Sequence, residues 1–285
     1  NTRIQDYRNP FYGQYAENGG YLYIESSRSR ALNHTELLTW RKSFGLHNVD
    51  ALIGHDYYQR KWDYLNGSRE MVYNPGIPEL GNAIKNQRAT SNANEYFTEG
   101  FLSRVQYDYN GKCFFSASYR RDASSRFHPD HRWGNFWTVG GSWIVSSEDF
   151  MATTASWLNF LKVKASYGEQ GNDRLLDARD RRYQNWYPYQ NPYTLSHHAD
   201  DFSLALALVG NPNIKWETNI NFNTGVEFGL WNDRLSGGVD FFIRRSKDLL
   251  FNRSVSLTLG YATYPDNAGT IHNSGVEVML TGTPI

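Results

Sequence analysis

Residues 215–231 read KWETNINFNTGVEFGLW, and every second residue has the same character. The even positions are apolar or β-branched: Trp216, Thr218, Ile220, Phe222, Thr224, Val226, Phe228 and Leu230. The odd positions are acidic, amide or glycine: Glu217, Asn219, Asn221, Asn223, Gly225, Glu227 and Gly229. A period of two sends alternate side chains to opposite faces, so this pattern predicts a β-strand.

The predicted strand is unusually long, roughly 50 Å at about 3.3 Å per residue. A bilayer-spanning strand needs about 9–11 residues, so a strand that crosses a membrane and projects beyond it fits this length. A long strand in a soluble β-sandwich is the alternative.

The composition narrows the class of protein. The chain has 285 residues, of which 20 are Tyr, 16 Phe and 9 Trp. No run of about 18 apolar residues is present, which excludes membrane-spanning helices. Aromatic girdles are typical of outer-membrane barrels, although sugar-binding extracellular domains are also rich in aromatic residues. The net charge is zero, which gives no indication of nucleic-acid binding, and we interpret the single cysteine, Cys113, as a packing residue.

The same alternation predicts nine strands. They are expected at 20–44, 47–62, 95–109, 112–126, 133–146, 158–171, 214–231, 234–251 and 273–283. The pairs Asn110-Gly111 and Asn232-Asp233 predict tight turns. Residues 20–44 are expected to form one strand, without a hairpin at Asn33-His34.

The connections between these strands alternate in length. Long ones are expected at 66–95, 122–132, 172–213 and 252–272, and short ones near 45–47, 110–111 and 231–234. Residues 147–157 are expected to form one short helix with Ser146 or Ser147 as its N-cap. Short turns at one end and long loops at the other are typical of transmembrane barrels. An odd number of strands leaves two open edges, which lipid does not tolerate, so either the rest of the barrel lies outside this chain or the closed-barrel interpretation is wrong.

Several runs of sequence resemble one known family. They are RRDASSRFHPDHRWGNF, SSEDFM, WLNFLKVKASYGEQGN, NPNIKWETNINFNTGVEFGLWNDRLSGGVDFFIRRSKDLL and NAGTIHNSGVEVMLTGTPI. In this order they are similar to the barrel of the SusC/RagA-like TonB-dependent outer-membrane transporters of Bacteroidetes. The resemblance covers nearly the whole chain.

The resemblance implies an all-β, antiparallel transmembrane β-barrel segment, in which residues 1–285 supply about nine strands of a roughly 22-stranded barrel with a plugged lumen. It implies active uptake of oligosaccharides or peptides across the bacterial outer membrane. The implied partners are outer-membrane lipid, a SusD-like lipoprotein lid and the TonB–ExbB–ExbD complex, which would act through an N-terminal region. The plug and the closing strands have no counterpart in this chain.

The charged residues on the predicted strands occupy the same alternating positions as the other polar residues. They are Arg104, Arg120, Lys162, Lys164, Glu217, Glu227, Asp240 and Arg244. In a barrel these side chains face the lumen, because a charge on the lipid side near the midplane costs about 2–4 kcal/mol. Pairing with one another or with a plug is the structural interpretation, and lining a substrate route is the functional one.

The loop run YQNWYPYQNPY, at 183–193, combines aromatic rings with amides, which suits sugar rings. We therefore regard Trp186, Tyr187 and Tyr189 as ligand-binding candidates, with packing or partner docking as the alternative. Residues 128–131 (HPDH) contain possible metal ligands, but no fourth ligand is evident there. Residues 197–201 (HHADD) form a second such cluster, on a predicted external loop, that could take calcium or zinc. We expect no metal site and no cofactor, with loop-bound Ca²⁺ as the alternative kept open.

No nucleophile, zinc or nucleotide motif stands in a supporting context, so the chain is not expected to be an enzyme. The alternatives to active transport are a passive porin and a soluble extracellular carbohydrate-binding β-protein.

Overall fold

A computed structural model of the chain describes residues 1–175, 186–198, 201–206 and 209–283. Ten strands form one sheet in which most neighbours are consecutive along the chain. In order across the sheet they are β1 (Thr2–Arg8), β2 (Tyr21–Phe44), β3 (His47–Val72), β4 (Ala83–Tyr109), β5 (Cys113–Ser124), β6 (Trp133–Ile144), β7 (Leu158–Asn172), β10 (Glu217–Leu230), β11 (Leu235–Lys247) and β14 (Thr270–Gly282). This meander of long strands confirms the predicted barrel-type sheet, and β2 passes through Asn33 and His34 without a hairpin.

Two small hairpins lie in long connections, where the sequence predicted only loops. β8 (Tyr193–His198) pairs with β9 (Asp201–Leu206), and β12 (Leu250–Ser254) pairs with β13 (Thr263–Asn267). Short 3₁₀ turns occur at Leu80–Asn82, Val145–Ser147, Asp149–Thr154 and Leu257–Leu259. No helix in the described part of the chain is long and apolar enough to cross a membrane.

Three sequence predictions about the elements were wrong. The strand β1 was missed, and the loop expected at 66–95 is shorter, because β3 continues to Val72 and β4 begins at Ala83. These strand ends carry few apolar residues, so they lack the alternation on which the prediction depended. The helix expected at 147–157 is instead two 3₁₀ turns, preceded by Ile144 and Glu148, and neither residue makes a side-chain cap.

The turns between neighbouring strands have the predicted chemistry. Asn110 and Gly111 both have positive φ, 52° and 65°, the conformation that a two-residue hairpin turn of this type requires. Asn232 and Asp233 also have positive φ. These tight turns fix the register of the strands that they join.

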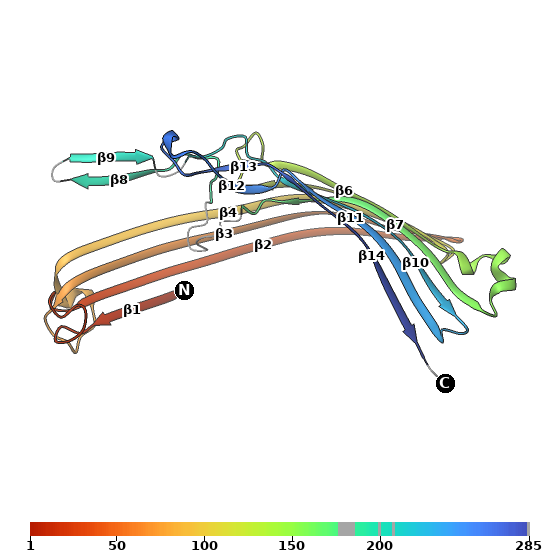
Figure 1. Cartoon of the computed structure of the whole chain (residues 1–285), viewed down its shortest axis with the longest axis horizontal. Helices are drawn as coiled ribbons and strands as arrows, with labels where there is room; N and C mark the ends of the chain where they lie inside the picture. Colours follow the sequence, from red (N-terminus) through yellow and green to blue (C-terminus); the bar gives the residue numbers. More distant parts are fainter. Residues whose placement is uncertain (176–185, 199–200, 207–208, 284–285) are drawn as a thin grey trace. The chain divides into compact units, whose positions relative to one another are not determined.

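The chain divides into two compact units, 1–33 with 58–97, and 34–57 with 98–285. The first has a small core of Leu22, Val72 and Ala83. The second contains β5, β6, β7, β10, β11 and β14, which run side by side (Figure 1). Its buried cluster consists of Phe127, Ile214 and Leu250, near the long connections.

Candidate functional site

The strand register sorts the side chains of the second unit onto two faces, because residues directly opposite each other in neighbouring strands share a face. Lys162 lies opposite Glu227, and Gly225 lies opposite both Lys164 and Asp240. Followed strand by strand, the register places every predicted strand charge on this same face. We call it the charged face; its predicted members are Arg104, Arg120, Lys162, Lys164, Glu217, Glu227, Asp240 and Arg244.

The opposite face, which we call the apolar face, has a central band without charge. Val105, Ala117 and Val139 lie in one row across β4, β5 and β6, and a second row is Val163, Val226, Val239 and Val278. Thr224 also belongs to this face, where its hydroxyl donates to the Lys164 carbonyl at 3.1 Å. That bond satisfies a polar group which lipid would leave without a partner.

Lys164 is the centre of the ion pairs on the charged face. Its Nζ lies 2.8 Å from Glu227 Oε1 and 2.9 Å from Asp240 Oδ1, and Lys162 Nζ lies 3.8 Å from Glu227 Oε2. Gly225 lies on β10, between Lys164 on β7 and Asp240 on β11. A Cβ at this position would overlap the Asp240 carboxylate. The missing side chain therefore makes room for the cluster. Two lysines and two carboxylates balance each other's charge.

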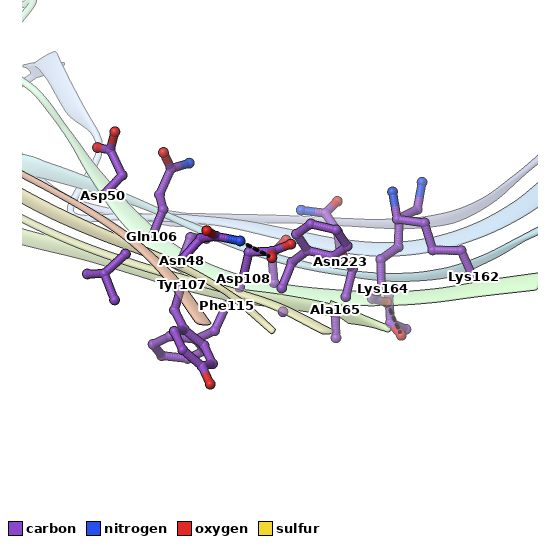
Figure 2. Close-up of a pocket in the computed structure, with 18 of the residues that line it drawn as sticks. Asn48, Asp50, Gln106, Tyr107, Asp108, Phe115, Lys162, Lys164, Ala165 and Asn223 are labelled. Carbon is purple, nitrogen blue, oxygen red and sulfur yellow. Dashed lines mark hydrogen bonds between the residues drawn. The ribbon is translucent and has the colours of Figure 1, made fainter. Parts of the chain in front are cut away.

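Lys162, Lys164 and Asp240 line a pocket of about 880 Å³ on the sheet. Lys162, Lys164 and Asn223 point to the same side of the sheet in Figure 2, as do Asp50 and Gln106. A further polar contact comes from Asn48 Nδ2, which donates to Asp108 Oδ1 at 2.9 Å. The pocket offers cations, carboxylates and amides, so its chemistry suits a polar ligand or a polar protein surface rather than an apolar one.

A second ion-pair cluster lies on the same face. Arg120 Nε donates to both oxygens of Asp122 at 2.7 Å, and its Nη2 lies 2.8 Å from Asp56 Oδ2. Gly100 lies directly beneath this cluster, and a Cβ there would overlap both carboxylates and the guanidinium. Arg120 thus ties β3 to β5, which is a structural role.

The remaining predicted charges do not join these clusters. Glu217 is 9 % exposed and accepts from the Leu250 amide at 3.2 Å, so it anchors the start of the loop that follows β11. The Arg244 guanidinium lies 4.9 Å from the centre of the Phe242 ring and lines the pocket. Arg104 lies on the charged face outside the pocket lining.

The aromatic loop is held by packing. Pro188 is fully buried, and Tyr189 packs against the cluster of Phe127, Ile214 and Leu250. Trp186 and Tyr187 are half-buried. Residues 183–185 of the run lie outside the described residues. Packing accounts for the position of Tyr189, and ligand contact by these three rings stays a prediction.

The two candidate metal motifs lie in long connections between strands of the sheet. His128 Nδ1 lies 3.3 Å from Asp130 Oδ2, and the His128 ring meets Tyr189 edge-on at 5.8 Å. In the described part of the chain, no three His, Cys, Asp or Glu side chains are placed to hold a metal ion. The side chains of the HHADD run at 197–201 lie outside the described residues, so loop-bound Ca²⁺ stays a prediction.

An asparagine that the sequence analysis did not single out joins two long connections. Asn267 Oδ1 accepts from the Lys215 amide at 2.8 Å, and its Nδ2 donates to the Lys215 carbonyl at 2.9 Å. The Asn211 side chain likewise donates to the Pro265 carbonyl at 3.0 Å. Both residues belong to runs quoted above for the resemblance, NPNIKWE and NAGT. Their presence in these two runs was the available signal for this structural role.

At the short-turn end, Glu148 joins two connections. It accepts from Trp143 Nε1 at 3.0 Å and from Lys112 Nζ at 3.0 Å. The Trp143 indole, followed by the Lys112 ammonium, holds the pKa of the Glu148 carboxyl below its ordinary value. The same contact raises the pKa of Lys112. Glu148 is therefore charged whenever the turn is intact at neutral pH.

Comparisons with known proteins agree with this architecture. Residues 1–283 match the family model described as TonB dependent receptor-like, beta-barrel. TonB-dependent receptor P39 of Formosa agariphila is 31% identical over 242 residues, covering 84% of this chain and 22% of that protein. TonB-dependent receptor SusC of Bacteroides thetaiotaomicron is 28% identical over 258 residues, covering 89% of this chain and 25% of that protein.

Among solved structures, the RagAB peptide transporter superposes with a TM-score of 0.82 at 27% identity, covering 93% of this chain and 29% of that chain. The chain thus spans about a quarter of the length of these relatives. The family consists of outer-membrane β-barrels and is not enzymatic. With the family model matched over nearly all of its residues, the chain belongs to the TonB-dependent receptor β-barrel family and is SusC/RagA-like.

Proposed function

We propose that this chain forms part of the wall of a transporter that imports oligosaccharides or peptides across the outer membrane. The observation that carries the proposal is the division of one sheet into two faces. The apolar face carries a band without charge, and the charged face carries ion pairs around a polar pocket. A wall with lipid on one side and a water-filled interior on the other requires this division.

The peptide class follows from a relative, and the oligosaccharide class follows from the resemblance of the sequence to SusC/RagA-like transporters. One solved relative is described as a peptide transporter, and SusC is a receptor of the same family. The pocket on the charged face supplies both cations and carboxylates, which suit the charged ends and amides of a peptide. The amides Asn48, Gln106 and Asn223 suit the hydroxyls of a sugar. We keep both classes within the proposal.

The proposed partners are those of active uptake. A SusD-like surface lipoprotein would hold substrate over the long connections, and the TonB–ExbB–ExbD complex would supply the energy. The aromatic rings of Trp186, Tyr187 and Tyr189 lie in a long connection, where either substrate or the lipoprotein would meet them.

The test is uptake by cells that carry the full-length protein. Fluorescent oligosaccharides and fluorescent peptides are offered separately to wild-type cells and to cells in which the gene is deleted. We expect deletion to abolish uptake of one class, and a proton-motive-force uncoupler to have the same effect. Uptake that persists with the uncoupler would identify a passive porin, and uptake unchanged by the deletion of the gene would refute transport of either class.

A further inference from the structure

Arg121 is a cation on the apolar face, beyond its uncharged central band, where Glu99, Glu169 and Arg245 also lie toward the long connections. It lies opposite Phe101 on β4 and Asn135 on β6, and so shares the apolar face with Tyr119 and Ala117. Its neighbour in sequence, Arg120, lies on the charged face and is paired with Asp56 and Asp122. Among the residues that the structure describes, no carboxylate forms an ion pair with Arg121.

The position of Arg121 along its strand is informative. Cys113 lies opposite Trp143 at the short-turn end of the apolar face. The nine residues 113–121 match the length of about 9–11 that a tilted strand needs to cross the bilayer. The connections beyond Arg121 are long ones, and long loops of such barrels are extracellular. Arg121 therefore stands at the level of the outer-leaflet headgroups.

Aromatic rings hold the guanidinium at this level. Arg121 Cζ lies 5.0 Å from the centre of the Trp133 ring, within the range of a cation–π contact. The Phe101 ring stacks with that of Trp133, with the two ring centres 6.2 Å apart. Glu99, an acidic residue on this face at the same end, lies with its Oε1 3.1 Å from His55 Nε2. The guanidinium is thus oriented while its donors stay available.

The rest of a barrel does not cover this surface. β5 is flanked on both sides, by β4 and β6, so further strands can join only at the edges of the sheet. A plug would occupy the interior, on the charged face. What remains to meet Arg121 is the outer leaflet itself.

We infer that Arg121, supported by Trp133, binds the phosphate of an outer-leaflet lipid headgroup. The planar guanidinium matches the oxygens of a phosphate with two parallel hydrogen bonds, and the neighbouring apolar band would accommodate the acyl chains of the same molecule. This inference rests on the proposed function, because it requires the apolar face to meet lipid.

The experiment uses the full-length transporter in dodecyl maltoside micelles, whose headgroups carry no phosphate that could compete for Arg121. Native mass spectrometry measures the binding of added lipid A that carries its phosphate, and of the same lipid A after enzymatic dephosphorylation. We expect Arg121→Gln to weaken binding of the phosphorylated form about tenfold, because it removes hydrogen bonds between two charged groups. Arg121→Lys should lose less affinity for phosphorylated lipid A, since it keeps the positive charge but lacks the planar guanidinium.

Arg244→Gln is the matched control. Arg244 also lies over an aromatic ring, at 4.9 Å from the centre of Phe242, but on the charged face. The Arg244→Gln variant should leave lipid A binding unchanged. Equal affinity of wild type and Arg121→Gln, or equal loss in both glutamine variants, would overturn the inference, as would wild-type binding that ignores dephosphorylation. Displacement of lipid A by inorganic phosphate alone would place the site outside the lipid phase and overturn it too.

The outcome also separates this inference from the proposed function. Folding of each variant is checked by its heat-modifiable migration in gels. If Arg121→Gln folds and takes up substrate yet binds lipid A normally, only the phosphate site fails. If wild type does not insert as a barrel, the transport proposal fails with it.

Discussion

An arginine at position 105 tests which face of the sheet meets lipid. Val105 lies opposite Ala117, which lies opposite Val139. Ala117 is midway between Cys113 and Arg121, the residues that mark the two ends of the apolar band. Val105 is 44% exposed, so the larger side chain meets little steric resistance from the protein. Its cost comes almost entirely from the solvent that surrounds it.

The expected magnitude follows from that position. An arginine near the midplane of the lipid face costs about 2–4 kcal/mol, which is roughly a 30- to 700-fold change in the folding equilibrium. Gln106 is the matched site, because it is the next residue on β4, is exposed, and lines the pocket on the charged face. Gln106→Arg should change stability by no more than about 0.5 kcal/mol.

The assay is urea unfolding of the full-length protein in phosphatidylcholine vesicles, with the folded fraction read from heat-modifiable migration. Val105→Leu controls for the loss of the valine itself and should unfold close to wild type. Equal stability of Val105→Arg and Gln106→Arg would contradict the assignment of the two faces. A larger loss in Gln106→Arg would reverse it.

Two further changes test the local geometry. Gly100→Ala should destabilise the fold by about 1–3 kcal/mol, because its Cβ would overlap the carboxylates of Asp56 and Asp122; urea unfolding measures this, and wild-type stability would show that the pair can move aside. Glu148 has a lowered pKa, so its contacts with Trp143 and Lys112 stabilise the turn above the unfolded-state pKa and lose this effect as pH falls through the folded-state pKa. The stability difference between wild type and Glu148→Gln should therefore shrink on acidification, and a difference independent of pH would rule out the ionised contact.

The long alternating strands could be predicted from the sequence because each has one apolar face. Residues 215–231 gave both the strand and its two faces, and the observed β10 extends from Glu217 to Leu230. The alternation fails where both faces of a strand are polar. For that reason the extension of β3 to Val72 and the early start of β4 at Ala83 were missed.

The candidate site could be predicted only in part. The alternation along each strand placed Lys164, Glu227 and Asp240 on the polar face, because this assignment requires only the period of two. It could not supply their pairing, since that depends on register between strands. Asp56, which pairs with Arg120, lies 64 residues away in sequence. Such a partner can be found only when the order and offset of the strands are known.

Arg120 and Arg121 show why residue type alone does not reveal a role in such a wall. They carry the same side chain one position apart, yet alternation sends one to the charged face and the other to the apolar face. The first is neutralised by two carboxylates, and the second rests on an indole. The position of a residue in the alternation decides whether its side chain meets lipid, on the apolar face, or the barrel interior, on the charged face. Distance from the nearest short turn, here Asn110-Gly111, then decides whether a cation on the apolar face stands in hydrocarbon or at the headgroups. Because both quantities can be counted along the sequence, the same reasoning applies to any strand whose short turn is recognised.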